Sequence, residues 1–123
     1  MLLLDSNIII YATQPGFDDL RDLIRNNNSV TSIISKVETL GYHRLAEDDQ
    51  RFIIKLFNEI NLVGLTETIA DIAIGLRQEK SLSLGDALIA ATALALDLTL
   101  VTRNETDFRH IKGLKLINPF SEE

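Results

Sequence analysis

Short runs of apolar residues recur along the chain, separated by longer segments in which apolar residues follow a helical period. The runs carry apolar side chains on both faces, which is typical of strands buried in a parallel sheet. Residues 6–12 contain three isoleucines, but the pattern predicts neither a helix nor a strand there. The predicted strands are Leu2–Leu4, Ser29–Ser35, Ile60–Thr66, Leu98–Thr102 and Lys115–Asn118.

The segments between these runs predict helices, because their apolar residues recur at intervals of three and four. Ser35 and Glu38 match a capping box, in which a serine caps a helix and a glutamate bonds back to it. Thr66 and Ser83 are predicted caps of two later helices. The expected helices begin after Pro15 and Gly16, at Ser35, at Glu47, after Thr66 and after Ser83, and one helical turn covers Asp107–Ile111.

Strands and helices therefore alternate from one end of the chain to the other. This order predicts an α/β fold, with helices on both faces of a four- to five-stranded parallel sheet in a three-layer α/β/α sandwich. No repeat, low-complexity tract or linker interrupts the pattern. We therefore expect one domain over residues 1–123.

Composition narrows the class of protein. Apolar residues make up 46% of the chain and charged residues 24%, as in ordinary globular proteins. The absence of cysteine excludes disulfides and thiolate metal sites and fits a cytoplasmic location. No apolar run approaches the roughly 18 residues of a membrane span, so no membrane association is expected. The net charge of −6 argues against binding nucleic acid, unless carboxylates gather around a cation.

Acidic residues follow the predicted strands closely. Asp5 comes directly after the first strand, and Glu38 and Asp86 lie in the first turns of two helices. Asp107 lies shortly after the fourth strand. Ligands bind beyond the carboxyl ends of the strands in an open parallel sheet, so these four acids are expected to meet at one rim.

Each acid also has a purely structural interpretation that the sequence leaves open. Asp5 fits a turn or a helix cap, and Glu38 fits the capping box alone. Asp86 would complement the positive end of its helix dipole, and Asp107 would cap the short turn beside it. The joint placement of all four at one edge is what favours a functional site.

Four carboxylates at one rim repel one another, and some stay protonated at neutral pH unless a cation joins them. Oxygen ligands favour Mg²⁺ or Mn²⁺, and the chain offers no closely spaced histidine pair for a softer metal. His43 and His110 are isolated in sequence, and neither is needed as a general base. Such a site can activate a water and hold a phosphodiester for in-line displacement.

At these residues the sequence resembles the PIN domain family, and within it the small VapC-type toxins of toxin–antitoxin pairs. The resemblance covers essentially the whole chain. It rests on "LLLDSNIIIYA" at 2–12, "SIISKVETLGYHRL" at 32–45 and "LSLGDALIAATALALDLTLVTRNETDF" at 82–108. The last stretch is the most specific of the three.

The resemblance implies a ribonuclease that depends on Mg²⁺ or Mn²⁺ and cleaves RNA. It also implies a compact α/β/α sandwich and a homodimer held by a cognate antitoxin. The matching acids are Asp5, Glu38 and Asp86.

The fourth ligand of the implied metal site stays open. Many members of the family carry an aspartate where Asn104 stands, so the implied candidates are Asn104 as a neutral ligand and Asp107 as the source of the missing charge. Ser6 and Thr102 are the implied hydrogen-bond donors that hold the ligands.

Other features bear on substrate and partners. Arg103 and Arg109 flank the expected site and could contact phosphates. No stretch interleaves basic and aromatic residues, so base stacking is not predicted. The helix near residues 48–58 is rich in large apolar side chains, which suggests that an antitoxin segment or a second subunit covers part of it. These side chains are Phe52, Ile53, Leu56 and Phe57.

Two other functions would also place acids at this edge of the sheet. A phospho-acceptor domain also carries acids at strand ends, but position 7 is Asn where a dehalogenase-like phosphatase needs a second aspartate. A receiver needs an aspartate after the third strand, and none is present there. The alternative that Asn104 favours is a non-catalytic PIN-like scaffold that binds RNA or protein.

Overall fold

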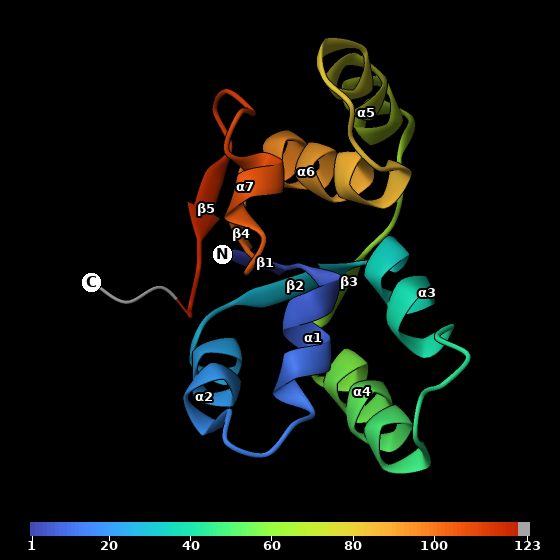
Figure 1. The fold of residues 1–123 in the computed structure, drawn as a ribbon, viewed down its shortest axis with the longest axis vertical. Helices are drawn as coiled ribbons and strands as arrows, with labels where there is room; N and C mark the ends of the chain where they lie inside the picture. The colour runs from blue at the N-terminus through green and yellow to red at the C-terminus, as the bar shows by residue number, and fades with distance from the viewer. Residues whose placement is uncertain (121–123) are drawn as a thin grey trace.

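A five-stranded sheet lies between two layers of helices in the computed structural model, which describes residues 1–120 (Figure 1). The strand order is β3-β2-β1-β4-β5, and every neighbouring pair is parallel. This confirms the predicted α/β sandwich. The strands are β1 (Leu2–Leu4), β2 (Ser29–Ser32), β3 (Asn61–Val63), β4 (Thr99–Val101) and β5 (Lys115–Ile117).

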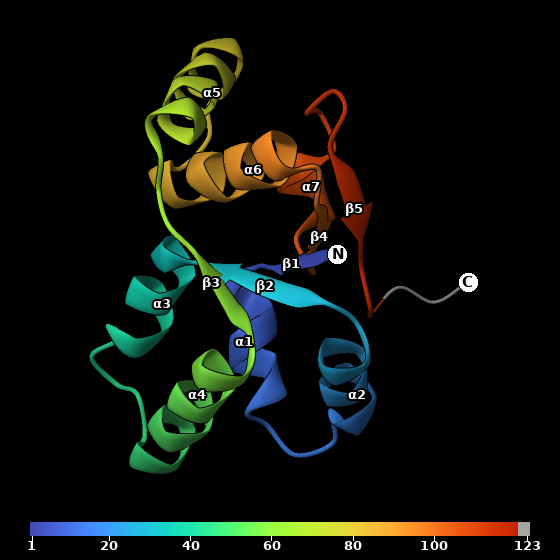
Figure 2. The same cartoon turned by 180° about the vertical axis from the view of Figure 1, so that it is seen from behind.

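Helices cover both faces of the sheet, as the two opposite views show (Figures 1 and 2). One layer holds α1 (Ser6–Ala12), α2 (Asp18–Asn26) and α4 (Glu47–Glu59). The other holds α5 (Glu67–Glu79) and α6 (Leu84–Leu96), which pack against each other. The short helices α3 (Ile33–Leu40) and α7 (Glu105–Phe108) follow β2 and β4.

The alternation of side chains along β1 divides the core into two parts. Leu3 is fully buried on the face covered by α5 and α6, together with Val30 and Ile89. Leu2 and Leu4 lie on the opposite face, against residues of α1, α2 and α4. Full burial of each large apolar side chain stabilises the fold by roughly 1.5–3 kcal/mol.

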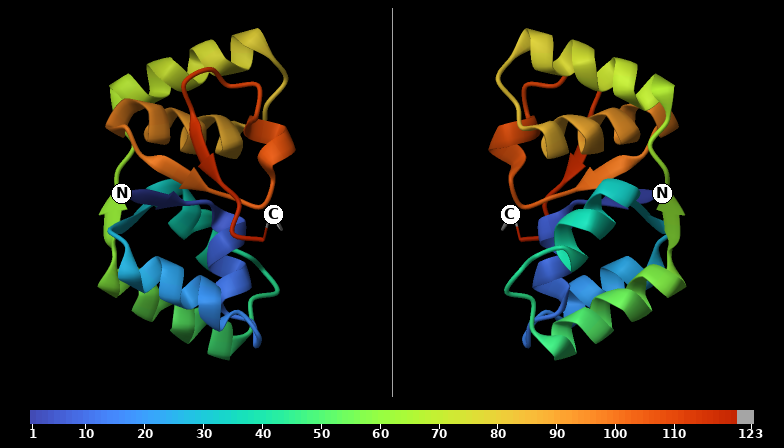
Figure 3. Two further views of the ribbon diagram at one scale, coloured as in Figure 1. Left: turned by 90° about the vertical axis from the view of Figure 1, so that its left-hand side faces the viewer. Right: turned by 90° about the vertical axis from the view of Figure 1, so that its right-hand side faces the viewer.

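The connectivity of the sheet creates one special position at its carboxyl edge. The chain adds β2 and β3 on one side of β1 and then crosses to add β4 on the other side. Leu4 pairs with Val101, so β1 and β4 end side by side. In Figure 3 the dark blue β1 and the orange β4 point toward the same edge, where α7 lies. Ligands bind at such a change of direction in open α/β sheets.

Several predicted boundaries are wrong, and capping explains the largest error. β2 ends at Ser32, whose hydroxyl accepts the Ile34 N–H at 3.0 Å, so α3 begins at Ile33, two residues earlier than predicted. Ser35 lies buried inside α3, so the predicted capping box does not form. The turn predicted over Asp107–Ile111 is α7, which begins earlier, at Glu105.

Two predicted helix caps are confirmed. Thr66 caps α5 by accepting the Ile69 N–H at 3.2 Å, and Ser83 caps α6 by accepting the Asp86 N–H at 3.1 Å. Within residues 1–120 no helix has the length and apolar character needed to cross a bilayer. The prediction of one domain over residues 1–123 extends beyond the described residues and stays a prediction.

Candidate active site

Asp5 occupies the switch point between β1 and β4. Its backbone N–H donates to Val101 O at 3.0 Å, and its side chain is only 4% exposed. The two carboxylate oxygens accept hydrogen bonds from Ser6 N at 2.8 Å and from Thr102 Oγ1 at 2.7 Å. Asp5 is also the N-cap of α1, so its interpretation as a helix cap is correct. The carboxylate is therefore held in one orientation from two sides.

Glu38 reaches the same region from α3. Its Oε1 accepts a hydrogen bond from Ser6 Oγ at 2.6 Å, and Ser6 Oγ also lies 3.0 Å from Ser35 Oγ. Its Oε2 lies against the backbone of Gly85 in α6, where an added Cβ would approach it to 2.6 Å. Because Ser35 is not the cap of α3, Glu38 has no capping role. Its carboxylate joins α1, α3 and α6.

Asp86 stands in the first turn of α6, next to Gly85. Its backbone N–H donates a hydrogen bond to Ser83 Oγ, and the residue is partly buried. The side chain lines a cavity of about 410 Å³ between α7 and the residues that precede α6. Lys80, Thr106, Asp107 and His110 also line this cavity.

Neighbouring acids act electrostatically on Asp5 and Asp86. Burial raises the pKa of Asp5, the Thr102 hydrogen bond opposes this shift, and the charges of Asp86 and Glu38 raise the pKa further. Burial also raises the pKa of Asp86, assisted by the charges of Asp107 and Glu38 and opposed by the hydrogen bond to Ser83. Carboxyl groups after β1, in α3 and in α6 therefore share one neighbourhood, in which the ionised forms of Asp5 and Asp86 are unfavourable.

Asn104 and Asp107 take different places at the edge of this neighbourhood. Asn104 is the exposed N-cap of α7, and its backbone N–H donates to Thr102 Oγ1 at 3.0 Å. Asp107 lies inside α7 and is exposed, so the interpretation of Asp107 as a cap is wrong. Its charge acts on Asp86, while Asn104 connects to Asp5 through Thr102.

The donor chemistry fits a divalent cation. Asp5, Glu38, Asp86 and Asp107 offer only oxygen atoms, which suit Mg²⁺ or Mn²⁺. A cation would also relieve the mutual repulsion that raises the pKa of two of these acids. Within residues 1–120, no group of three or more Asp, Glu or His side chains is already arranged to hold an ion. The assignment of these residues as metal ligands therefore stays a prediction.

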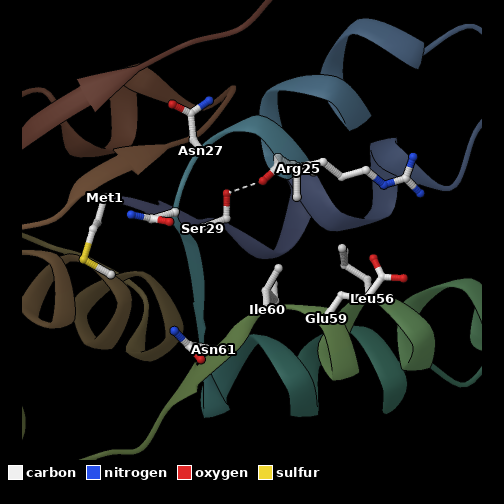
Figure 4. A pocket seen from close by; sticks show the side chains of 10 residues that line it. Met1, Arg25, Asn27, Ser29, Leu56, Glu59, Ile60 and Asn61 are labelled. Carbon is white, nitrogen blue, oxygen red and sulfur yellow. Dashed lines mark hydrogen bonds between the residues drawn. The ribbon is translucent and has the colours of Figure 1, made fainter.

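A second cavity lies at the opposite edge of the sheet, where the strands begin. It measures about 500 Å³ and lies beside Met1, Ser29 and Asn61, with Arg25 and Glu59 farther along its wall (Figure 4). The Ser29 hydroxyl donates to the Ile24 carbonyl at 2.8 Å. Glu59 is its only acid, so this cavity does not share the acidic character of the carboxyl edge.

Some contributors to the site were not evident from the sequence. Gly85 owes its role to the packing of α3 against α6, which no local pattern reveals. Lys80 and His110 reach the Asp86 cavity from segments on either side of α6. His43 is exposed beside Tyr42.

Comparison with known proteins agrees with this architecture. The sequence profile of the PIN domain matches residues 2–114. Ribonuclease VapC10 of Mycobacterium tuberculosis is 33% identical, over 94% of this chain and 91% of its own length. A toxin–antitoxin complex from Klebsiella pneumoniae contains a chain that is 30% identical, with a TM-score of 0.81, over 99% of this chain and 100% of that one.

A further solved structure extends the likeness. It is that of VapBC2 from Rickettsia felis bound to a DNA fragment from its promoter, with 25% identity and a TM-score of 0.82 over 95% of this chain and 97% of that one. The family profile and the relatives match nearly the whole chain. The chain therefore belongs to the PIN domain family and, within it, to the VapC type.

Proposed function

We propose that this protein is a metal-dependent endoribonuclease and the toxin of a toxin–antitoxin pair. The observation that supports the proposal is that Glu38 reaches toward Ser6 and Gly85, the neighbours of Asp5 and Asp86, while nearby acids help to raise the pKa of Asp5 and of Asp86. The similarity to a VapC ribonuclease over nearly the whole chain supports the same activity.

The residues divide the work in this proposal. Asp5, Glu38 and Asp86 hold Mg²⁺ or Mn²⁺, and Asp107 or Asn104 completes the set. Thr102 holds the carboxylate of Asp5 in place, and Ser6 does the same for Glu38. A bound divalent ion would supply activation of a water molecule and neutralisation of charge on the phosphodiester.

The proposal includes partners as well as chemistry. The similar structures are toxin–antitoxin complexes, which supports a cognate antitoxin here. We also infer a homodimer, and a cytoplasmic location because a toxin that cleaves RNA acts where its substrates are.

On α4, Ile53 and Leu56 are buried and Phe52 and Phe57 pack on the protein's own core, so the apolar excess expected there is smaller than predicted. Light scattering that shows only monomers at high concentration would contradict the dimer.

A cleavage assay tests the activity. Purified protein is incubated with varied single-stranded RNAs in Mg²⁺, in Mn²⁺ or in EDTA. We expect cleavage that EDTA abolishes and that Asp86→Asn reduces by at least about 100-fold, because loss of a group that merely supports a ligand already costs 10- to 100-fold. Asp22→Asn, which removes an exposed acid of α2, is the matched control and should cleave normally.

The non-catalytic scaffold is the competing function, and one observation favours it. Position 104 carries an amide, where the family resemblance implies an acid in many members. Cleavage that persists equally in EDTA, or in Asp86→Asn, would exclude the proposed metal site. The absence of cleavage on every RNA, with a melting temperature that Mn²⁺ leaves unchanged, would favour the scaffold.

A further inference from the structure

Arg103 lies next in sequence to Thr102, at the margin of the acidic site formed by Asp5, Glu38 and Asp86, and it contacts aromatic rings. It follows Thr102, the residue that bonds to Asp5. Its guanidinium carbon lies 5.1 Å from the ring centroid of Tyr11 and 4.7 Å from that of Phe120. Both distances are within the range of cation–π attraction, so the head group lies over two aromatic faces although the residue is exposed.

The rings under Arg103 come from three separate parts of the chain. Tyr11 belongs to α1, Phe17 precedes α2, and Phe120 follows β5. Their ring centroids are 5.1 to 5.7 Å apart, so each ring contacts the other two. This explains why no basic and aromatic pattern is visible in the sequence: the fold, and not the order of residues, brings the group together.

Hydrogen bonds fix the backbone that carries this arrangement. Thr102 N donates to Ile117 O at 3.0 Å, and Asn118 Oδ1 accepts the Phe120 N–H at 2.9 Å. The end of β4 and the segment after β5 are therefore tied together. Such preorganisation lowers the entropic cost of binding a ligand through the arginine.

The charge of Arg103 is also available. Among residues 1–120, Arg21, Arg51 and Arg109 each pair with a carboxylate, whereas no carboxylate lies within ion-pair distance of Arg103. A planar guanidinium with an open edge matches the geometry of a phosphate. The acids nearby would repel the RNA backbone, so a fixed cation at their margin has a clear use.

We propose that Arg103, seated on Tyr11 and Phe120, binds a backbone phosphate of the RNA next to the one that is cleaved. The inference rests on the proposed ribonuclease function. Tyr11 lies six residues beyond Asp5 along α1, which corresponds to roughly 9 Å at the rise of an α-helix. The contact is therefore made to a neighbouring phosphate and contributes to binding more than to the chemical step.

The test measures kcat and KM for RNA cleavage from 50 to 300 mM KCl. Arg103→Gln is expected to lower kcat/KM about tenfold, mainly through KM, because a hydrogen-bonded contact to a charged group is lost. The plot of log kcat/KM against log salt should flatten by about 0.7, the value for one phosphate contact to a single strand. Arg103→Lys keeps the charge and should keep the slope.

Arg51→Gln is the matched control, because it removes the same charge from an exposed arginine of α4. It should leave KM and the salt slope unchanged. The single variants Tyr11→Leu and Phe120→Leu should each raise KM while retaining the salt slope. The positive charge stays in both, but an aromatic ring that supports the guanidinium is lost.

The outcomes separate the two proposals. If the wild type cleaves RNA but Arg103→Gln matches Arg51→Gln in KM and slope, the phosphate contact is wrong and the ribonuclease stands. If Arg103→Gln lowers only the melting temperature, the arginine merely secures the segment after β5, and the inference also fails. A wild type that cleaves no RNA overturns both proposals.

Discussion

At the scale of single residues, the site depends on contacts that range from predictable to invisible in the sequence. Asp5, Glu38 and Asp86 could be identified because each lies at a strand end or in the first turn or two of a helix. The contact of Glu38 with Gly85 could not be predicted, because it depends on how closely α3 approaches α6. That contact makes a glycine part of the acidic site.

Gly85→Ala should impair activity without impairing folding. A Cβ at this position would lie 2.6 Å from Glu38 Oε2, which is too close, so the carboxylate must move. Glu38 is exposed, so its side chain has room to turn away, and alanine is a better helix former than glycine. We therefore expect the free energy of unfolding to fall by no more than about 1 kcal/mol or to rise. Displacement of a ligand by about 1 Å can cost roughly 100-fold, so RNA cleavage should drop at least about tenfold.

Gly75→Ala provides the control for this prediction. Gly75 lies in α5, and an added Cβ there would meet nothing within 4 Å. Denaturant unfolding and cleavage rates of both variants are measured side by side. Equal cleavage by Gly85→Ala and Gly75→Ala would show that Gly85 does not position Glu38.

At the scale of elements, local signals predicted most helices and strands but missed α1. Thr66 and Ser83 are recognisable caps, and their helices begin where expected. The isoleucines of residues 8–10 disfavour a helix because β-branched side chains lose rotamer freedom there. In the structure the cap at Asp5 and the complete burial of Ile8 and Ile9 outweigh that preference. Tertiary packing therefore decided an element that propensity argued against.

Strand β2 contains a polar atom whose removal should stabilise the protein. Thr31 is fully buried, and within residues 1–120 its Oγ1 is the one buried side-chain oxygen or nitrogen without a hydrogen-bond partner. An unsatisfied buried hydroxyl costs roughly 1–3 kcal/mol. Thr31→Val, measured by urea unfolding, should raise the free energy of unfolding by about 1 kcal/mol.

Thr92→Val tests whether this gain is specific to Thr31. Thr92 is also buried, but its Oγ1 donates to Leu88 O at 2.7 Å. Its replacement should leave stability unchanged or lower it by about 1 kcal/mol. A loss of stability in Thr31→Val would mean that the hydroxyl has a partner, such as a buried water.

At the scale of the whole molecule, the acidic site opposes the stability of the fold that builds it. The net charge of −6, taken alone, argues against binding of nucleic acid. In the proposed function the acids favour RNA binding only where they hold a cation together. Burial and mutual repulsion raise the pKa values of Asp5 and Asp86, so their ionised forms are less favourable in the folded protein than in the unfolded chain. The proposed function and the stability of the fold therefore conflict at this edge of the sheet.

This conflict predicts a pH dependence with a definite sign. Well below the usual carboxyl range, Asp5 is protonated in both the folded and the unfolded chain and costs nothing. As the pH rises through that range, the unfolded chain ionises first, so it binds fewer protons and the free energy of unfolding falls. The loss is complete once the pH exceeds the raised pKa of the folded protein.

Asp5→Asn should therefore be more stable than the wild type at pH 7 in EDTA, and this gain should shrink as the pH falls toward 4. Asparagine can keep both contacts, accepting from Ser6 N and donating to Thr102 Oγ1, while it removes the charge. Urea unfolding of the two proteins across this pH range measures the difference, and Asp22→Asn controls for the loss of one acid from the surface. A gain in stability that is the same at every pH would contradict this prediction, and so would a variant less stable than the wild type at pH 7. Either result would show that hydrogen bonds stabilise the buried carboxylate sufficiently without a cation.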